Sequence, residues 1–289
     1  MIHQDHEPVI HQDYVFEQIA TGIPAAEGPV VDLEGNLFLV SSNAGTILRI
    51  QEGSAPTIHV HTGGIPAGLQ VDRENRLWCA DMKLGILCID PSGNLSRAVD
   101  TYEGEPIRGC NDLYFDSEGN LYFTAPAGSN ADTPAGEVFC LLKSGETVAI
   151  DDGYRFSNGL AVTADDSQLI VAETHTQSLW SYDLIAPGKV SNKRLWAKLP
   201  TDGVGPDGMD FDADGNLLVA HVGASSIEVF SPEGKLIERI QTPFERPSNV
   251  HFEKPNSKHL LITDMSNGSI WRTTWKRPGQ PQYCFGNPE

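Results

Sequence analysis

One turn sequence recurs along the whole chain. It consists of an acid, a glycine or asparagine three residues later, and a leucine that opens an apolar stretch. Four close copies and two looser ones begin at Asp32, Asp72, Asp116, Asp212, Thr163 and Glu253. The spacing of roughly 40 to 48 residues is typical of the blades of a β-propeller. Because each blade in such a fold packs only against its neighbours, this repeat constrains the fold more than any other feature.

The residues between these turns predict strands. Short stretches rich in Val, Ile, Leu, Phe and Tyr are bounded by Gly, Asn, Asp and Pro. In the first copy we expect strands over 28–32, 37–41, 46–50 and 57–61. The third strands of the other copies are expected over 85–89, 137–142, 178–184, 226–230 and 269–275. The sequence therefore predicts an all-β fold, a six-bladed β-propeller with four antiparallel strands per blade.

One position of the repeated turn predicts a special backbone conformation. The four close copies hold Gly35, Asn75, Gly119 and Gly215 there. Gly and Asn tolerate a positive φ at low cost, so we expect a hairpin turn with positive φ at each of them.

The ring of blades needs a strand that closes it, and the N-terminal residues lie outside the repeats. We expect residues 14–19 to complete the last blade, with 282–285 as the other candidate. Residues 1–13 contain a duplicated Ile-His-Gln-Asp and are predicted to be an N-terminal tail. Residues 14–289 are then one propeller domain.

Composition excludes several classes of function. The formal charge of −19 argues against nucleic acid as a partner, since phosphates are bound by clustered Lys and Arg. No apolar stretch approaches the roughly 20 residues of a membrane span, and the N-terminus lacks the pattern of a signal peptide. The five cysteines form no CxxC pair. We therefore expect a cytoplasmic protein with no membrane contact and with reduced, mostly buried thiols.

Equivalent positions of the repeat must lie on a ring around the propeller axis. Five residues before the turn acid, the six copies hold Glu27, Ala67, Asn111, Asn158, Asp207 and Ser248. Four of these side chains carry carboxylate or amide oxygens, and none is His or Cys. Calcium prefers about six to eight oxygen ligands, whereas zinc and copper prefer imidazole or thiolate. We therefore predict a calcium site here, in which Glu27 and Asp207 neutralise the charge of the ion.

A second level of the channel lies three residues further along each inner strand. The copies hold Val30, Gln70, Tyr114, Ala161, Asp210 and His251 at this level. A buried acid beside an imidazole needs a partner or a metal. Two interpretations of Asp210 and His251 stay open: a second, structural calcium ion, or a simple ion pair.

Long segments of the chain carry a family resemblance. They are IPAAEGPVVD, GGIPAGLQVDRE, GCNDLYFDSEGNLYFTAPAG, LIVAETHTQSLWSYDL, PDGMDFDADGNLLVA and PFERPSNVHFE. From about residue 23 to 284 the chain resembles the diisopropyl fluorophosphatase family, calcium-dependent six-bladed propellers within the wider gluconolactonase and paraoxonase-like group.

The resemblance implies roles for particular residues. It makes Glu27, Asn111, Asn158 and Asp207 the ligands of a catalytic calcium ion. It makes Asp210, the Val250 carbonyl and His251 the ligands of a structural one. The predicted substrate pocket contains Met82, His221, Val222, Ser248 and Met265. Val222 and Met265 stand where the family has a pocket Trp and a pocket His, and the loop near 42–45 is shorter.

Three functions follow as hypotheses. A metal site near neutrality favours a small, uncharged ester, fluoridate or lactone as substrate. The first hypothesis is a calcium-dependent phosphotriester hydrolase in which the calcium ion is a Lewis acid, with either the Asp207 carboxylate or an activated water as nucleophile. The second is a lactonase, and the third is a calcium-binding propeller without catalysis.

Overall fold

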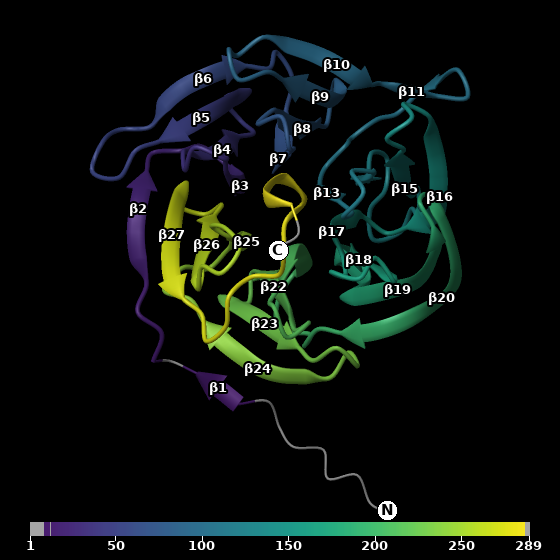
Figure 1. The fold of residues 1–289 in the computed structure, drawn as a ribbon. Coiled ribbons are helices and arrows are strands. Elements are labelled where there is room, and N and C mark those ends of the chain that lie inside the picture. The colour runs from purple at the N-terminus through teal and green to yellow at the C-terminus, as the bar shows by residue number, and fades with distance from the viewer. Residues whose placement is uncertain (1–8, 12, 287–289) are drawn as a thin grey trace, which may run out of the picture.

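Six antiparallel sheets stand around a central axis as the blades of a propeller (Figure 1). The structure is a computed structural model and describes residues 9–11 and 13–286. In each blade of this described part, consecutive strands run outward from the axis, except where the chain closes the ring. The predicted fold class is therefore confirmed.

The strand bounds agree closely with the repeat. The first three blades consist of β3 (Ala26–Val31), β4 (Leu37–Ser41), β5 (Thr46–Ile50) and β6 (Thr57–His61); β7 (Pro66–Val71), β8 (Leu77–Asp81), β9 (Gly85–Ile89) and β10 (Leu95–Val99); β13 (Leu113–Phe115), β14 (Leu121–Ala125), β15 (Gly136–Leu141) and β16 (Thr147–Tyr154). Three of the four strands expected in the first copy have the predicted bounds. A small hairpin of β11 (Thr101–Tyr102) and β12 (Glu105–Pro106) lies between the second and third blades.

The other three blades follow the same plan. They consist of β17 (Ser157–Val162), β18 (Gln168–Glu173), β19 (Ser178–Ala186) and β20 (Lys189–Lys198); β21 (Gly205–Phe211), β22 (Leu217–Val222), β23 (Ser226–Phe230) and β24 (Leu236–Gln241); β25 (Pro247–Phe252), β26 (His259–Asp264), β27 (Ser269–Thr274) and β2 (Glu17–Thr21). Two single-turn helices, η1 (Thr174–Thr176) and η2 (Tyr283–Phe285), complete the described structure, in which no helix can span a membrane.

The N-terminal segment closes the ring, as the first candidate predicted. Strand β2 pairs antiparallel with β27, from Glu17 opposite Arg272 to Thr21 opposite Ser269. The alternative candidate, 282–285, was wrong, because that segment forms η2 near the axis instead of an outer strand (Figure 1).

Part of the expected tail is also attached to the propeller. Strand β1 (Val9–His11) pairs in parallel with β24 and adds a fifth strand to the fifth blade. Tyr14 then stacks on Trp275 and donates a hydrogen bond of 2.9 Å to Glu238. Residues 1–8 and 12 of the predicted tail lie outside the described residues.

Each repeated turn is held by its own acid. The Asp32 carboxylate accepts hydrogen bonds from the backbone N–H groups of Glu34 and Asn36, at 2.9 and 2.7 Å. The third residue after the acid has a positive φ in all four close copies, as predicted. The φ values are +85°, +60°, +95° and +80° at Gly35, Asn75, Gly119 and Gly215.

The hydrophobic core lies between neighbouring blades. Apolar side chains from adjacent sheets form five buried clusters, each of which draws on two or three blades. All five cysteines are free and four are buried, which confirms the prediction of reduced, mostly buried thiols. A tightly packed set of blades leaves their inner strands facing one another across the axis, and the candidate site is built there.

Candidate metal centre

The four predicted ligands lie where the inner strands begin, at one end of the channel. Glu27, Asn158 and Asp207 lie in β3, β17 and β21, and Asn111 lies two residues before β13. Glu27, Asn158 and Asp207 are buried, with exposed fractions of 6%, 4% and 8%. The four residues therefore come from the inner ends of four different blades, as the repeat predicted.

Small residues let the inner strands approach closely at this level. The position after the ring residue holds Gly28, Gly68, Gly159 and Gly208 in four of the six blades. A Cβ atom on Gly68 would lie 2.9 Å from the Asn111 carbonyl oxygen, and one on Gly159 would overlap with the Asp207 carbonyl oxygen. The glycines therefore bring the backbones of neighbouring ring residues together.

A bulge at the start of the inner strands orients the ring residues. The pairing register shifts between Glu27 and Val30 in β3, between Ser157 and Leu160 in β17, and between Pro206 and Met209 in β21. A bulge adds a residue to one strand and turns a side chain away from the regular pleat. Asn158 and Asp207 lie inside the shifted segments of their blades, and Glu27 lies at the edge of its own.

Asn158 presents an oxygen that no group among the described residues satisfies. Its Nδ2 donates a hydrogen bond of 3.0 Å to the Thr174 hydroxyl, which in turn donates one of 2.8 Å to the Pro206 carbonyl. The Oδ1 atom is buried and has no hydrogen-bond partner. A buried polar oxygen without a partner is costly, so this atom is suited to a ligand such as a cation.

The carboxylates of the ring share one buried space. Burial is the main cause that raises the pKa of Glu27 to about 8, although the Asn249 amide, which donates a hydrogen bond of 2.8 Å, opposes the shift. Burial also raises the pKa of Asp207 well above its ordinary value, and repulsion from Glu27 adds to it. Two acids that repel each other in a buried ring gain most from a divalent cation between them.

The donor set fits calcium. The ring offers two carboxylates and two amide oxygens, and these are the hard ligands that calcium prefers. Among the described residues no three His, Cys, Asp or Glu side chains form a metal cluster, and the ring itself contains only two acids. Its remaining donors are amides.

Sequence reasoning missed Asp112. This residue follows Asn111 at the repeat position that is glycine in four blades, and it lines a small cavity in the channel. Burial raises the pKa of Asp112 to about 7, and its charge raises the pKa of both Glu27 and Asp207. The sequence did carry a signal for Asp112. An acid at a position that is glycine in four blades must point into the crowded channel.

The raised pKa of Glu27 predicts how pH acts on the metal-free protein. The group binds a proton in the folded chain that the unfolded chain releases between its ordinary pKa of 4.5 and about 8. Stability contributed by this group is therefore present below pH 4.5 and is lost as pH rises, by about 1.4 kcal/mol per pH unit. In excess chelator, we expect the melting temperature to fall between pH 5 and pH 8.

The control for this experiment is Glu27→Gln, which has no proton to lose. Its melting temperature in chelator should depend less on pH than that of the unaltered protein. With calcium present the fall should also shrink, since a bound cation holds the ring carboxylates in their charged form. Identical pH slopes for the two chelated proteins would contradict the assignment.

The second level of the channel brings Asp210 and His251 together. The Nδ1 atom of His251 lies 3.3 Å from Asp210 Oδ2, and Val250 precedes His251 in β25. Asp210 also accepts hydrogen bonds from Tyr114, Phe211 and Phe252. Groups of the chain therefore supply all of these contacts of Asp210, as the ion-pair interpretation requires.

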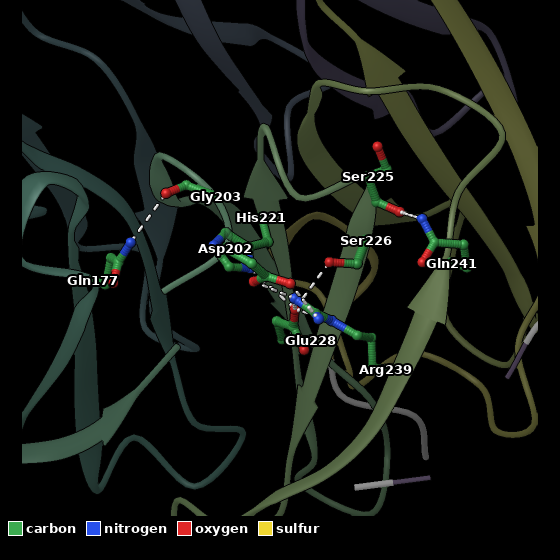
Figure 2. Close-up of polar contacts among 9 residues, drawn as sticks. All are labelled: Gln177, Asp202, Gly203, His221, Ser225, Ser226, Glu228, Arg239 and Gln241. Atoms are coloured by element: carbon green, nitrogen blue, oxygen red, sulfur yellow. Dashed lines mark hydrogen bonds and ion pairs between the residues drawn. The ribbon is translucent and has the colours of Figure 1, made fainter. Parts of the chain in front are cut away.

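His221 does not line the surface of a pocket as predicted. Its side chain is 0% exposed, and its Nδ1 lies 3.0 Å from Glu228 Oε1 on the neighbouring strand (Figure 2). Arg239 binds the same carboxylate and also holds Asp202, while the His221 ring abuts Gly203. This ion-pair network draws the imidazole into the blade, beneath the 201–204 segment.

Ser248 is also buried behind the ring. Its hydroxyl lies 2.9 Å from that of Thr263 and donates a hydrogen bond of 3.2 Å to the Ala26 carbonyl. It is 0% exposed and connects the sixth blade to the first. Ser248 therefore supports the neighbourhood of Glu27 and does not form part of a pocket surface.

Met82 and Met265 lie beside the mouth of the ring. Each directly follows a second strand, β8 or β26, and both are partly exposed. Thr174 occupies the same repeat position after β18 and contacts Asn158. Val222, at the end of β22, is 5% exposed. The pocket role of these three predicted residues, Met82, Val222 and Met265, stays a prediction.

Comparison with known proteins places the chain in a family. The family described as "SMP-30/Gluconolactonase/LRE-like region" matches residues 25–266, which include all four ring ligands and the second-level residues. The chain belongs to this family. The resemblance found in the sequence segments is therefore confirmed.

Members of the SMP-30/gluconolactonase/LRE-like family include enzymes. The chain is 43% identical to diisopropyl-fluorophosphatase from Loligo vulgaris, over 96% of each chain. It is 30% identical to a gluconolactonase from Zymomonas mobilis, over 82% of this chain and 75% of that one. The structure of a calcium-binding protein, regucalcin, from Agrobacterium tumefaciens has the same fold, with a TM-score of 0.81, 17% identity and coverage of 96% and 98%.

Proposed function

We propose that the chain is a calcium-dependent hydrolase of small, uncharged phosphotriesters and phosphofluoridates. Glu27, Asn111, Asn158 and Asp207 would hold the ion. The observation that carries the proposal is the partnerless, buried Asn158 Oδ1 beside two buried acids at the channel mouth. The 43% identity to a diisopropyl-fluorophosphatase over 96% of the chain supports the substrate class.

The charge of the ring favours a neutral substrate. A bound calcium ion supplies a Lewis acid that polarises a phosphoryl or carbonyl oxygen. The carboxylates of Glu27 and Asp207 balance the double charge of such an ion, so the mouth of the channel offers no net attraction to an anion. The overall charge of −19 disfavours anionic substrates further.

The chain contains a carboxylate that can act as the nucleophile. In the proposed step, an Asp207 oxygen forms a bond to phosphorus, and the phosphorus–fluorine bond breaks with its electron pair leaving as fluoride. Water then attacks the carboxyl carbon of the phosphoryl-aspartate and breaks the bond from that carbon to the bridging oxygen, which releases the phosphodiester anion and two protons and restores the carboxylate. The buried, charged form of Asp207 that this step requires is the form that a neighbouring cation stabilises.

Single-turnover hydrolysis in heavy-oxygen water tests this step. If water attacks the carboxyl carbon of the phosphoryl-aspartate, the heavy isotope enters the Asp207 carboxylate, and the product of the first turnover takes its new oxygen from the unlabelled carboxylate. Mass spectrometry of the peptide that contains Asp207 should show the label. Label found in the product of a single turnover, with none in the protein, would exclude this sequence of steps in favour of a water that attacks phosphorus.

A lactonase function is the second candidate. The observation in its favour concerns the predicted substrate pocket. Val222 and Met265 occupy the positions where the resemblance predicts a Trp and a His. The 30% identity to a gluconolactonase also supports it. A calcium-binding propeller without catalysis is the third candidate.

One panel of assays separates the three candidates. Fluoride release from a phosphofluoridate and acid release from several lactones are measured with calcium and after complete chelation. We expect fluoride release that stops on chelation and returns with added calcium. Lactone hydrolysis alone would replace the first candidate with the second, and inactivity on every compound would favour the third. Activity unchanged without calcium would contradict both hydrolase proposals.

A further inference from the structure

The second level of the channel contains a carboxylate that is closely surrounded by groups of the chain. Oδ1 of Asp210 accepts hydrogen bonds from the Tyr114 hydroxyl at 3.2 Å and from the Phe211 N–H at 2.9 Å. Oδ2 accepts one from the Phe252 N–H at 3.1 Å and lies 3.3 Å from His251 Nδ1. Three hydrogen bonds and the nearby imidazole nitrogen therefore surround a carboxylate with about four acceptor positions, which leaves little room for a cation.

Both nitrogens of His251 are engaged as well. Nδ1 faces Asp210, and Nε2 lies 3.4 Å from the Gln282 amide nitrogen. The same amide donates a hydrogen bond of 2.7 Å to the Phe252 carbonyl, which fixes its position. An imidazole that carries a proton on Nδ1, facing Asp210, satisfies this contact. Its Nδ1 then has no lone pair to offer a metal.

The C-terminal segment anchors the phenol. The Gln280 amide donates hydrogen bonds to the Tyr114 hydroxyl at 2.6 Å and to the Val162 carbonyl at 2.8 Å. Gln280 is 5% exposed and Tyr114 is 9% exposed. Four separate parts of the chain therefore meet here: the inner strands of the third, fourth and fifth blades and the segment that runs to the axis after the last blade (Figure 1).

We propose that Tyr114 and Gln280 form a latch that takes the place of a second cation at Asp210. The phenol hydroxyl supplies the positive end of a dipole to the carboxylate, and the amide holds the phenol in position. The channel then binds calcium at the ring of Glu27 and Asp207 and none at Asp210 and His251. This inference concerns a site separate from the ring, so its test does not depend on catalysis.

Counting bound calcium by equilibrium dialysis tests the latch. The full chain should bind one ion, and Asp210→Asn should leave that count unchanged. Tyr114→Ala removes the phenol hydroxyl from Asp210 Oδ1 and should raise the number of bound calcium ions to two. The double variant Tyr114→Ala with Asp210→Asn should bind one ion again. Gln280→Ala keeps the phenol but removes the amide that holds it, and should also gain a weaker second ion.

Two results would overturn the latch. The first is a count of two in the unaltered chain that falls to one in Asp210→Asn, which would show a cation at Asp210. The second is a count that neither Tyr114→Ala nor Gln280→Ala changes, since the phenol would then not be what excludes the ion. Failure of the ring to bind calcium would lower every count by one and leave the difference between variants intact, so the two proposals are tested separately.

Discussion

Asp207→Asn is expected to reduce fluoride release by about 10³-fold or more in kcat, because it removes both the proposed nucleophile and one of the two charges that hold the cation. Calcium affinity should fall together with the rate. The buried asparagine preserves the shape of the site and removes a carboxylate whose pKa burial raises well above its ordinary value, so the change relieves a costly buried charge. The melting temperature in chelator should therefore not decrease.

The matched control is Asp152→Asn, the same change on an exposed residue of the outer strand β16. It should leave kcat and calcium affinity unaltered. Initial rates at saturating calcium, with calcium binding measured on the same preparations, distinguish loss of the ion from loss of the nucleophile. A kcat near that of the unaltered protein in Asp207→Asn would remove this residue from the proposed chemistry.

Gly159→Ala should destabilise the protein by about 3 kcal/mol or more and abolish calcium binding at the ring. The added methyl group would overlap with the Asp207 carbonyl oxygen, which belongs to the next blade, and the backbone cannot move without separating two inner strands. Asn158 and Asp207 would then no longer share one cation. Urea denaturation with and without calcium measures both effects, since the stabilisation by calcium should disappear.

Gly145→Ala is the control for this variant. Gly145 has a φ of +92° but no atom within 4 Å of an added Cβ, so the change introduces backbone strain without overlap. We expect a loss of about 1 kcal/mol and unaltered calcium binding. Equal losses in the two variants, with the stabilisation by calcium kept in both, would show that close approach of the inner strands is not what forms the ring.

The candidate ring could be predicted because it depends on a repeated local pattern. Turn acids such as Asp32 and Asp116 fix the alignment of the copies. The residue five positions before the turn acid then lies near the axis in every blade. The same reasoning placed Tyr114, Asp210 and His251 on one level, where the structure shows them in contact. It did not show which partners each would choose, because hydrogen bonds between blades depend on packing.

His221 shows where the reasoning from the repeat ended. Its place at the end of a second strand indicates the mouth of the channel, yet Glu228 draws its ring inside the blade. A side chain at a given backbone position can turn to several rotamers, and a buried ion pair selects among them. The sequence carries no periodic signal for such a pair.

The sequence alone determined the number of blades, the order of their strands, the positive-φ turns and the four oxygen donors at one level. Each of these follows from a local pattern that recurs along the chain. Only the tertiary structure decided the bulges that aim Glu27 and Asp207, the entry of Asp112 into the channel, and the path of Gln280 to Tyr114 across 166 positions of the chain. These features require surfaces from different blades to meet, and a contact between distant segments exists only after the ring has closed.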